Sequence, residues 1–219
     1  MGLLPPRNAM PADDVPFAIA RERPVRARHA ASLIVWRREG DDTAVLMGMR
    51  GARHRFMPSK LVFPGGAVDP ADKNAPFATA IAQATRAALE RSANPTLAQA
   101  LAYAAARELA EETGLTLGNP PKLDALRYLC RAVTPPGLPI RFNARFFTIA
   151  AEHVSGTLAG DGELENLRFY SLCELHAFDL AWITREVLVI FERWLLSTET
   201  ERLASTGFPV CRRQRWAME

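Results

Sequence analysis

The sequence has little cysteine and no long uninterrupted apolar run. Its three cysteines, Cys130, Cys173 and Cys211, lie far apart, and no C-x-x-C occurs. This pattern argues against a disulfide framework or a zinc site and favours a reducing compartment. The most apolar late segment, residues 181–196, is interrupted by arginines and glutamates. The start of the chain lacks a signal-peptide pattern, so we expect a soluble, cytoplasmic protein without membrane contact.

Common catalytic and nucleotide-binding motifs are missing as well. There is no G-x-S-x-G, no P-loop and no H-E-x-x-H, and the four histidines are isolated from one another. The net charge of +3 and the pI of about 9.0 suit an anionic small ligand such as a phosphate ester. A bias of this size is too small to predict nucleic-acid binding, which would need a clustered basic face.

The length of 219 residues, 48% of them hydrophobic, predicts one domain with extensions. We expect an N-terminal arm over residues 1–28, a folded domain over 29–206 and a polar C-terminal tail over 207–219. Strand patterns occur at 29–37, 44–50, 61–63, 127–134, 141–150 and 167–171, and helical patterns at 76–92, 96–113 and 183–203. The first two strands are expected to pair across the turn at Glu39 to Asp42, whose Gly and Asp residues suit a turn. Strands interleaved with helices predict an α/β/α sandwich with a mixed sheet.

Three glutamates on the second predicted helix are the main chemical feature. Glu108, Glu111 and Glu112 stand at i, i+3 and i+4 and therefore share one helix face. Carboxylates this close repel one another unless a cation lies among them, and Mg²⁺, with Mn²⁺ as an alternative, prefers such oxygen ligands. The other interpretation is a solvated acidic helix face. The apolar stripe on the opposite side favours the metal site, because it packs the helix in a fixed orientation.

A second feature is the pair Gly65-Gly66, which follows the short strand that ends at Phe63. Paired glycines let the backbone approach a ligand or another element closely, although a simple turn would have the same composition.

Together these features resemble the Nudix box, whose pattern is G-x5-E-x7-R-E-U-x-E-E-x-G-U with U aliphatic. Gly66 matches the first glycine, Asp72 replaces the first glutamate, and residues 107–115 match every specified position of the second half. Where the family has seven residues between the halves, this chain has thirty-four, residues 73–106. The resemblance implies a Nudix fold with a helical insertion at about 73–98.

The resemblance also implies roles for the residues that match. Glu108, Glu111 and Glu112 would be metal ligands or the catalytic base, and Arg107 would orient them through charge-assisted hydrogen bonds. In the family the base sometimes lies on a loop before a late strand, where this chain has Glu163 and Glu165. An exposed acidic loop is the alternative interpretation there.

Residues 50–72 and 137–147 are similar to the coenzyme A diphosphatase branch, which also carries an insertion within its box. This similarity implies coenzyme A or acyl-coenzyme A as substrate, with Arg50, Arg53, Gly65 and Gly66 as binding residues. Arginine binds phosphate bidentately, so a basic segment suits a substrate with several phosphates.

Three alternatives remain open at the level of sequence. The substrate could be ADP-ribose or a nucleotide sugar, it could be a dinucleotide polyphosphate, or the chain could be a non-catalytic nucleotide-binding module. An apolar channel for a pantetheine or acyl arm could be lined by Met47, Met49, Phe56 and Met57, although such residues are more often core. Family members are often homodimers.

Overall fold

The computed structural model describes residues 25–51, 57–160, 162–205 and 207–219. In these ranges the strands are β1 (Arg28–Glu39), β2 (Asp42–Arg50), β3 (Leu61–Val62), β4 (Gly65–Ala67), β5 (Leu115–Thr116), β6 (Arg127–Val133), β7 (Phe142–Ala150), β8 (Ser155–Gly156), β9 (Leu164–Ser171), β10 (Pro209–Arg212) and β11 (Arg215–Met218). The helices are α1 (Gln83–Glu90), α2 (Pro95–Thr113), α3 (Leu172–Leu175), α4 (Trp182–Leu196) and α5 (Glu199–Ala204), with 3₁₀ turns η2 (Pro70–Lys73) and η3 (Ala151–His153).

The described residues form a nine-stranded sheet in the order β11-β10-β6-β7-β1-β2-β3, with β4 on β1 and β9 on β2. β1 pairs with β7 and β10 pairs with β6 in parallel, and the other pairs of this sheet are antiparallel. The predicted mixed sheet is therefore confirmed, as is the hairpin between β1 and β2. A second, two-stranded sheet joins β5 to β8.

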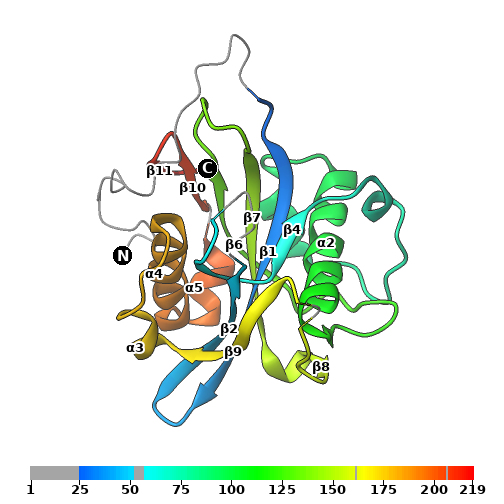
Figure 1. The fold of residues 1–219 in the computed structure, drawn as a ribbon. Coiled ribbons are helices and arrows are strands. Elements are labelled where there is room, and N and C mark those ends of the chain that lie inside the picture. Colours follow the sequence, from blue (N-terminus) through cyan, green and yellow to red (C-terminus); the bar gives the residue numbers. More distant parts are fainter. Residues whose placement is uncertain (1–24, 52–56, 161, 206) are drawn as a thin grey trace.

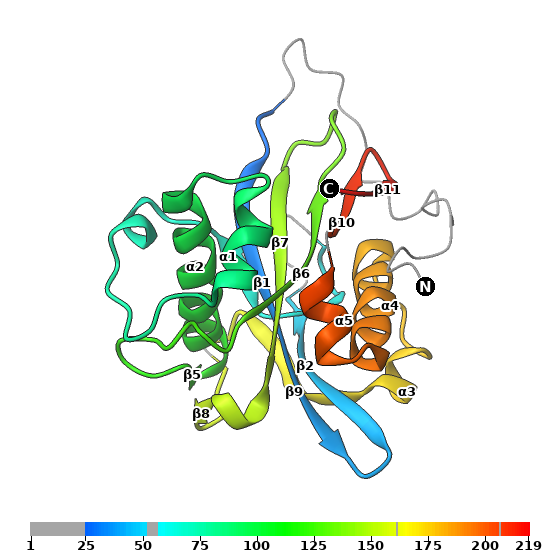
Figure 2. The ribbon, with the colours of Figure 1, turned by 180° about the vertical axis from the view of Figure 1, so that it is seen from behind.

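Helices cover both faces of the large sheet, with α1 and α2 on one side and α4 and α5 on the other (Figures 1 and 2). The alternation of side chains along β1 produces the two cores. Leu33 and Val35 pack in the cluster with α2, while Ile34 packs in the cluster with α4. All three are fully buried, so β1 is a central strand of an α/β/α sandwich.

Helix α2 begins and ends as its sequence indicates. The Asn94 side chain accepts a hydrogen bond from the Leu97 amide at 2.8 Å, and Pro95 occupies the first turn. At the other end Gly114 adopts a left-handed conformation with φ 71°. The glutamates lie in the last two turns, so this capped end sets their position.

Two predicted helices differ from the structure. The Ala-rich segment 76–92 is helical only from residue 83, because Ala78 and Thr79 pair instead with the backbone of residues 121–123. Such tertiary pairing overrides intrinsic helix propensity. The late helical pattern is split into α4 and α5 at Thr198, which caps α5 through a capping box with Glu201.

The C-terminal segment also differs from the predicted polar tail. It forms the hairpin β10–β11 at one edge of the large sheet, with Arg213 and Gln214 at positive φ in the turn. The hairpin could not be predicted from this short, charged sequence, because its partners are distant in the chain. Glu219, for example, accepts two hydrogen bonds from Arg131, each at 2.9 Å. Among the described residues, no helix combines the length and apolarity needed to cross a membrane.

Candidate active site

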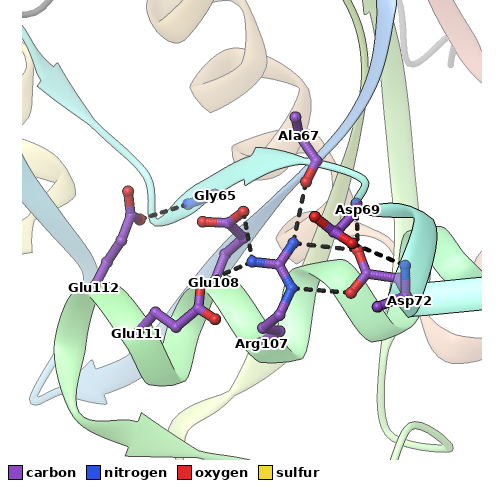
Figure 3. Close-up of polar contacts among 9 residues, drawn as sticks. Gly65, Ala67, Asp69, Asp72, Arg107, Glu108, Glu111 and Glu112 are labelled. Atoms are coloured by element: carbon purple, nitrogen blue, oxygen red, sulfur yellow. Dashed lines mark hydrogen bonds and ion pairs between the residues drawn. The ribbon is translucent and has the colours of Figure 1, made fainter. Parts of the chain in front are cut away.

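Arg107 connects the two halves of the motif (Figure 3). Its Nε donates to Asp72 Oδ1 at 2.9 Å, and its Nη2 donates to the Ala67 carbonyl at 3.0 Å. Its Nη1 donates to Glu108 Oε1 at 2.9 Å and to Glu111 Oε2 at 2.7 Å. The Asp72 side chain is only 1% exposed and also accepts from the Asp69 amide at 2.7 Å. Arg107 thus holds two glutamates with one end of its guanidinium and a buried aspartate with the other.

Glu112 is the most buried carboxylate of the helix face, at 2% exposure. It accepts a hydrogen bond from the Gly65 amide at 2.8 Å. Burial raises the pKa of Glu112 to about 8; the negative charges of Glu108 and Glu163 add to the rise, and the Gly65 amide and Arg50 oppose it. Burial likewise raises the pKa of Glu108. A cation at this position would remove the electrostatic cost of ionising both groups.

Glycine is required at positions 65 and 66 because other groups lie too close there for a side chain. Gly65 has φ 154°, and a Cβ there would lie 2.4 Å from the Ala31 carbonyl oxygen. A Cβ on Gly66 would lie 2.4 Å from Glu108 Oε1. Gly66 therefore lies directly against the acidic face, while Gly65 lies close to β1 and reaches that face through its amide, which donates to Glu112. Their predicted contact with substrate stays a prediction.

Gly66→Ala is expected to lower kcat/KM at least about tenfold, because the new methyl group displaces the Glu108 carboxylate. The carboxylate is the flexible end of a side chain, so the melting temperature should change little. Gly40→Ala is the control: its Cβ meets nothing within 4 Å, and its φ of 61° affects stability only. Steady-state kinetics and thermal melts separate the two effects. Unchanged kinetics for Gly66→Ala would remove Glu108 from the reaction.

A cavity of about 900 Å³ opens beside this face. Glu108, Glu111 and Glu112 line it together with Gly65 and Gly66. Glu163, just before β9, also lines it, and its charge adds to the rise that burial causes in the pKa of Glu108 and of Glu112. Glu165 instead pairs with Met49 in the sheet and is not among the lining residues. Of the two loop glutamates, the structure brings Glu163 into the site.

Cations border the same end of the cavity. Arg50 lies at the end of β2, and its Nε is buried with no hydrogen-bond partner in the described part of the chain. Lys60 also lines the cavity but binds Asp179 at 2.5 Å. The predicted binding residue Arg53, and with it Arg55, lies outside the described residues. Arg28 also lines the cavity, with its guanidinium over the Phe142 ring. The charge of Arg50 acts on Glu112, so Arg50 is the cation best placed for a phosphate beside the glutamates.

The sequence pattern missed the apolar residues of the cavity. Of the proposed channel residues, Met57 lines it, Met47 and Met49 belong to the core around α4, and Phe56 lies outside the described residues. The side chains that form the apolar walls come from β6, β7, β10, α4 and the loops near them: Phe63, Ala132, Leu138, Phe142, Ala144, Phe146, Trp182, Ile183 and Cys211. No local signal links such distant segments.

Metal binding is compatible with the donor set, although the described residues contain no group of three or more His, Cys, Asp or Glu side chains arranged to hold an ion. Mg²⁺ commonly uses only one or two carboxylates and keeps several waters. Glu108 and Glu112 supply hard oxygen donors whose ionised forms are unfavourable without a cation. Glu111, whose side chain is 54% exposed and hydrogen-bonded to Arg107, lines the same cavity.

Comparison with known proteins places the chain in a family. The family model described as NUDIX domain matches residues 26–189. A NUDIX hydrolase from Alicyclobacillus acidocaldarius is 25% identical, with a TM-score of 0.60 over 82% of this chain and 96% of that chain. A MutT/nudix family protein from Enterococcus faecalis is 12% identical, with a TM-score of 0.52 over 87% of this chain and 72% of that chain. A search among curated proteins found no match.

The chain belongs to the NUDIX family, since the family model covers most of it, including the glutamate helix and the glycine pair. It is an enzyme of that family, a hydrolase acting on diphosphate bonds.

Proposed function

We propose that this enzyme is a Mg²⁺-dependent hydrolase of nucleoside diphosphate derivatives, and that coenzyme A or acyl-coenzyme A is its substrate. The observation that supports the reaction best is that four glutamates and Arg50 line one cavity, where the Nε of Arg50 is buried and its charge acts on Glu112. Such an arrangement suits a diphosphate bound between a cation held by the carboxylates and an arginine.

Each residue of this end has a role that follows from its position. Glu108 and Glu112 would hold the ion and Glu111 would complete its carboxylate ligands, while Arg107 positions Glu108 and Glu111. Bound Mg²⁺, or Mn²⁺ in its place, would polarise the phosphoryl group and lower the pKa of a water. Glu163, or Glu111 itself, accepts the proton of the attacking water, and Arg50 donates to the departing phosphate oxygens.

The coenzyme A assignment rests on the resemblance of residues 50–72 and 137–147 and on charge. Coenzyme A carries a 3′-phosphate in addition to its diphosphate, so it needs cations beyond the metal. Arg50 lines the cavity, and Arg53 follows it in the sequence segment 50–60, which also contains Arg55 and Lys60. Hydrolysis would yield 3′,5′-ADP and phosphopantetheine or its acyl form.

The test is a substrate panel assayed with Mg²⁺, with Mn²⁺ and with EDTA. It contains coenzyme A, an acyl-coenzyme A, ADP-ribose, a nucleotide sugar and a diadenosine polyphosphate. Preferred cleavage of the coenzyme A species, lost in EDTA, is the expected result. Preference for another diphosphate would move the substrate assignment and keep the reaction. Tight binding without cleavage of any compound would support a non-catalytic binding module instead.

The raised pKa of Glu112 predicts how the metal-free protein responds to pH. The folded state binds this proton more tightly than the unfolded state, in which the pKa of the glutamate is about 4.3. Stability should therefore fall as the pH rises from there to about 8, by up to about 1.4 kcal/mol per pH unit from this group. Added Mg²⁺ should restore stability most at the alkaline end, where the carboxylate is ionised.

Thermal melts from pH 5 to 8.5, with EDTA or Mg²⁺, measure this effect. Glu112→Gln is the control, because its amide stays neutral and the difference between the two proteins isolates the one carboxyl group. Parallel pH curves for the two metal-free proteins would contradict the prediction.

A further inference from the structure

The cavity continues past the acidic end into an apolar chamber. We use this name for the part lined by Leu138, Phe142, Ala144, Phe146, Trp182, Ile183 and Cys211. It lies on the face of the sheet that carries α4, opposite the face covered by α2. One cavity thus has a charged end that suits a diphosphate and an apolar end that suits a hydrocarbon group.

The sheet side of the chamber is built by alternation along β7. Phe142, Ala144 and Phe146 point to the same face, at every second residue. Phe146 packs edge-to-face on Phe63, with ring centroids 6.3 Å apart, so this wall is fixed in place. The small side chain of Ala144 between the two phenylalanines leaves room above the strand.

The opposite side comes from the first turn of α4. Trp182 is 6% exposed and belongs to the core around α4, while Ile183 beside it is only partly buried. Ile183 therefore presents hydrocarbon surface to the cavity. Such a surface is stabilised when an apolar group displaces water from it.

The C-terminal hairpin closes the chamber. Cys211 of β10 lines it, and so does Gln214 in the turn that follows. Both residues lie beyond residue 189, where the match to the NUDIX domain ends. This wall therefore belongs to a part of the chain that the family model does not cover.

We propose that the apolar chamber binds a hydrocarbon group of the substrate while the diphosphate lies at the glutamate end. The inference rests on the proposed function for the position of the diphosphate. Arg28, whose guanidinium lies over the Phe142 ring, also lines the cavity, as do Thr134, Thr184 and Gln214. The walls named above are nevertheless hydrocarbon for the most part, which suits an alkyl or acyl group better than a nucleobase that needs convergent donors and acceptors. Transfer of a methylene group from water to an apolar site is favourable by about 0.8 kcal/mol, or roughly fourfold in affinity. The affinity of the substrate should therefore rise with the length of its alkyl chain.

The experiment uses β-alkyl esters of ADP with methyl, butyl and octyl chains. Addition of water across the P–O–P bond converts each ester into AMP and an alkyl phosphate. We expect kcat/KM with Mg²⁺ to rise at least about tenfold from methyl to octyl, less than the full transfer energy allows. The dissociation constants for the slow variant Glu111→Gln should fall in the same order, with an increasingly negative heat-capacity change.

Two variants locate the effect. Ile183→Asn makes one wall polar and Ala144→Leu fills the space above β7, and each should flatten the dependence on chain length. Leu196→Asn, at the other end of α4 and 87% exposed, is the matched control and should leave the dependence as in the wild type. Failure of both chamber variants to alter the dependence would overturn the assignment.

The outcomes separate this inference from the proposed function. Equal cleavage of all three esters, with equal affinities, would overturn the chamber proposal and leave the hydrolase intact. Absence of cleavage for every ester would count against the proposed reaction, and the chamber proposal would then be decided by the affinities alone. Affinity that rises with chain length supports it, and affinity that does not overturns it.

Discussion

Replacement of Glu111 by glutamine is expected to lower kcat by on the order of 10²–10⁴-fold and to leave the fold unchanged. The side chain is 54% exposed, and among the described residues it accepts a hydrogen bond from Arg107. Glutamine keeps the size of the side chain but removes the charge that an ion or a proton requires. Single-turnover kinetics at saturating Mg²⁺ and a thermal melt measure the two effects.

Glu163 and Glu165 form a matched pair that tests whether the loop before β9 supplies the group that accepts the proton. Glu163 lines the cavity and Glu165, two residues later, does not, although both are exposed on the same segment. Glu163→Gln should reduce kcat if it accepts the proton, while Glu165→Gln should behave as wild type. Activity of Glu111→Gln within about threefold of wild type would mean that Glu111 neither binds the metal nor acts as base.

Arg107→Leu is expected to cost both stability and activity. The change leaves the Asp72 carboxylate, 1% exposed, without its cation, and breaking a buried ion pair in this way costs about 3–5 kcal/mol. It also frees Glu108 and Glu111, which then repel each other. Denaturant titration should show the lower free energy of unfolding, and kcat/KM should fall even at temperatures where the variant is fully folded.

The double variant Arg107→Leu/Asp72→Asn separates the two costs. The asparagine removes the unpaired charge yet retains a side-chain oxygen for the Asp69 amide, so much of the lost stability should return. Activity should not return, because the glutamates remain without their positioning residue. Equal instability of the single and double variants would show that the buried aspartate is not the source of the loss.

Local patterns were sufficient to predict the elements that carry the chemistry. The spacing of Glu108, Glu111 and Glu112 predicted one helix face, and the structure places all three at one end of a cavity. The strand patterns around Glu39 and Asp42 predicted a hairpin, and those residues pair as expected. Both features depend on interactions within a few residues of the chain, where helix and strand periodicity are reliable guides.

Contacts between distant segments could not be predicted in the same way. In the motif Asp72 replaces the family's glutamate, and the sequence pattern assigned it no role, whereas the structure shows a buried partner for Arg107. The apolar chamber joins β7, α4 and β10, and the charged sequence around Cys211 gave no sign of a buried strand. Such features depend on tertiary packing, which overrides local propensity.

The long segment between the two halves of the motif has a consequence for how relatives are recognised. Residues 73–106 contribute no lining residue to the cavity; Ile81, Leu89 and Leu101 from this segment pack instead in the core around α2. Because Arg107 and Asp72 hold the two ends of this segment together, a change in its length need not move the residues that line the cavity. A pattern that demands fixed spacing would overlook chains of this kind. A search for the two halves separately, with either aspartate or glutamate allowed at the position of Asp72, would recover them.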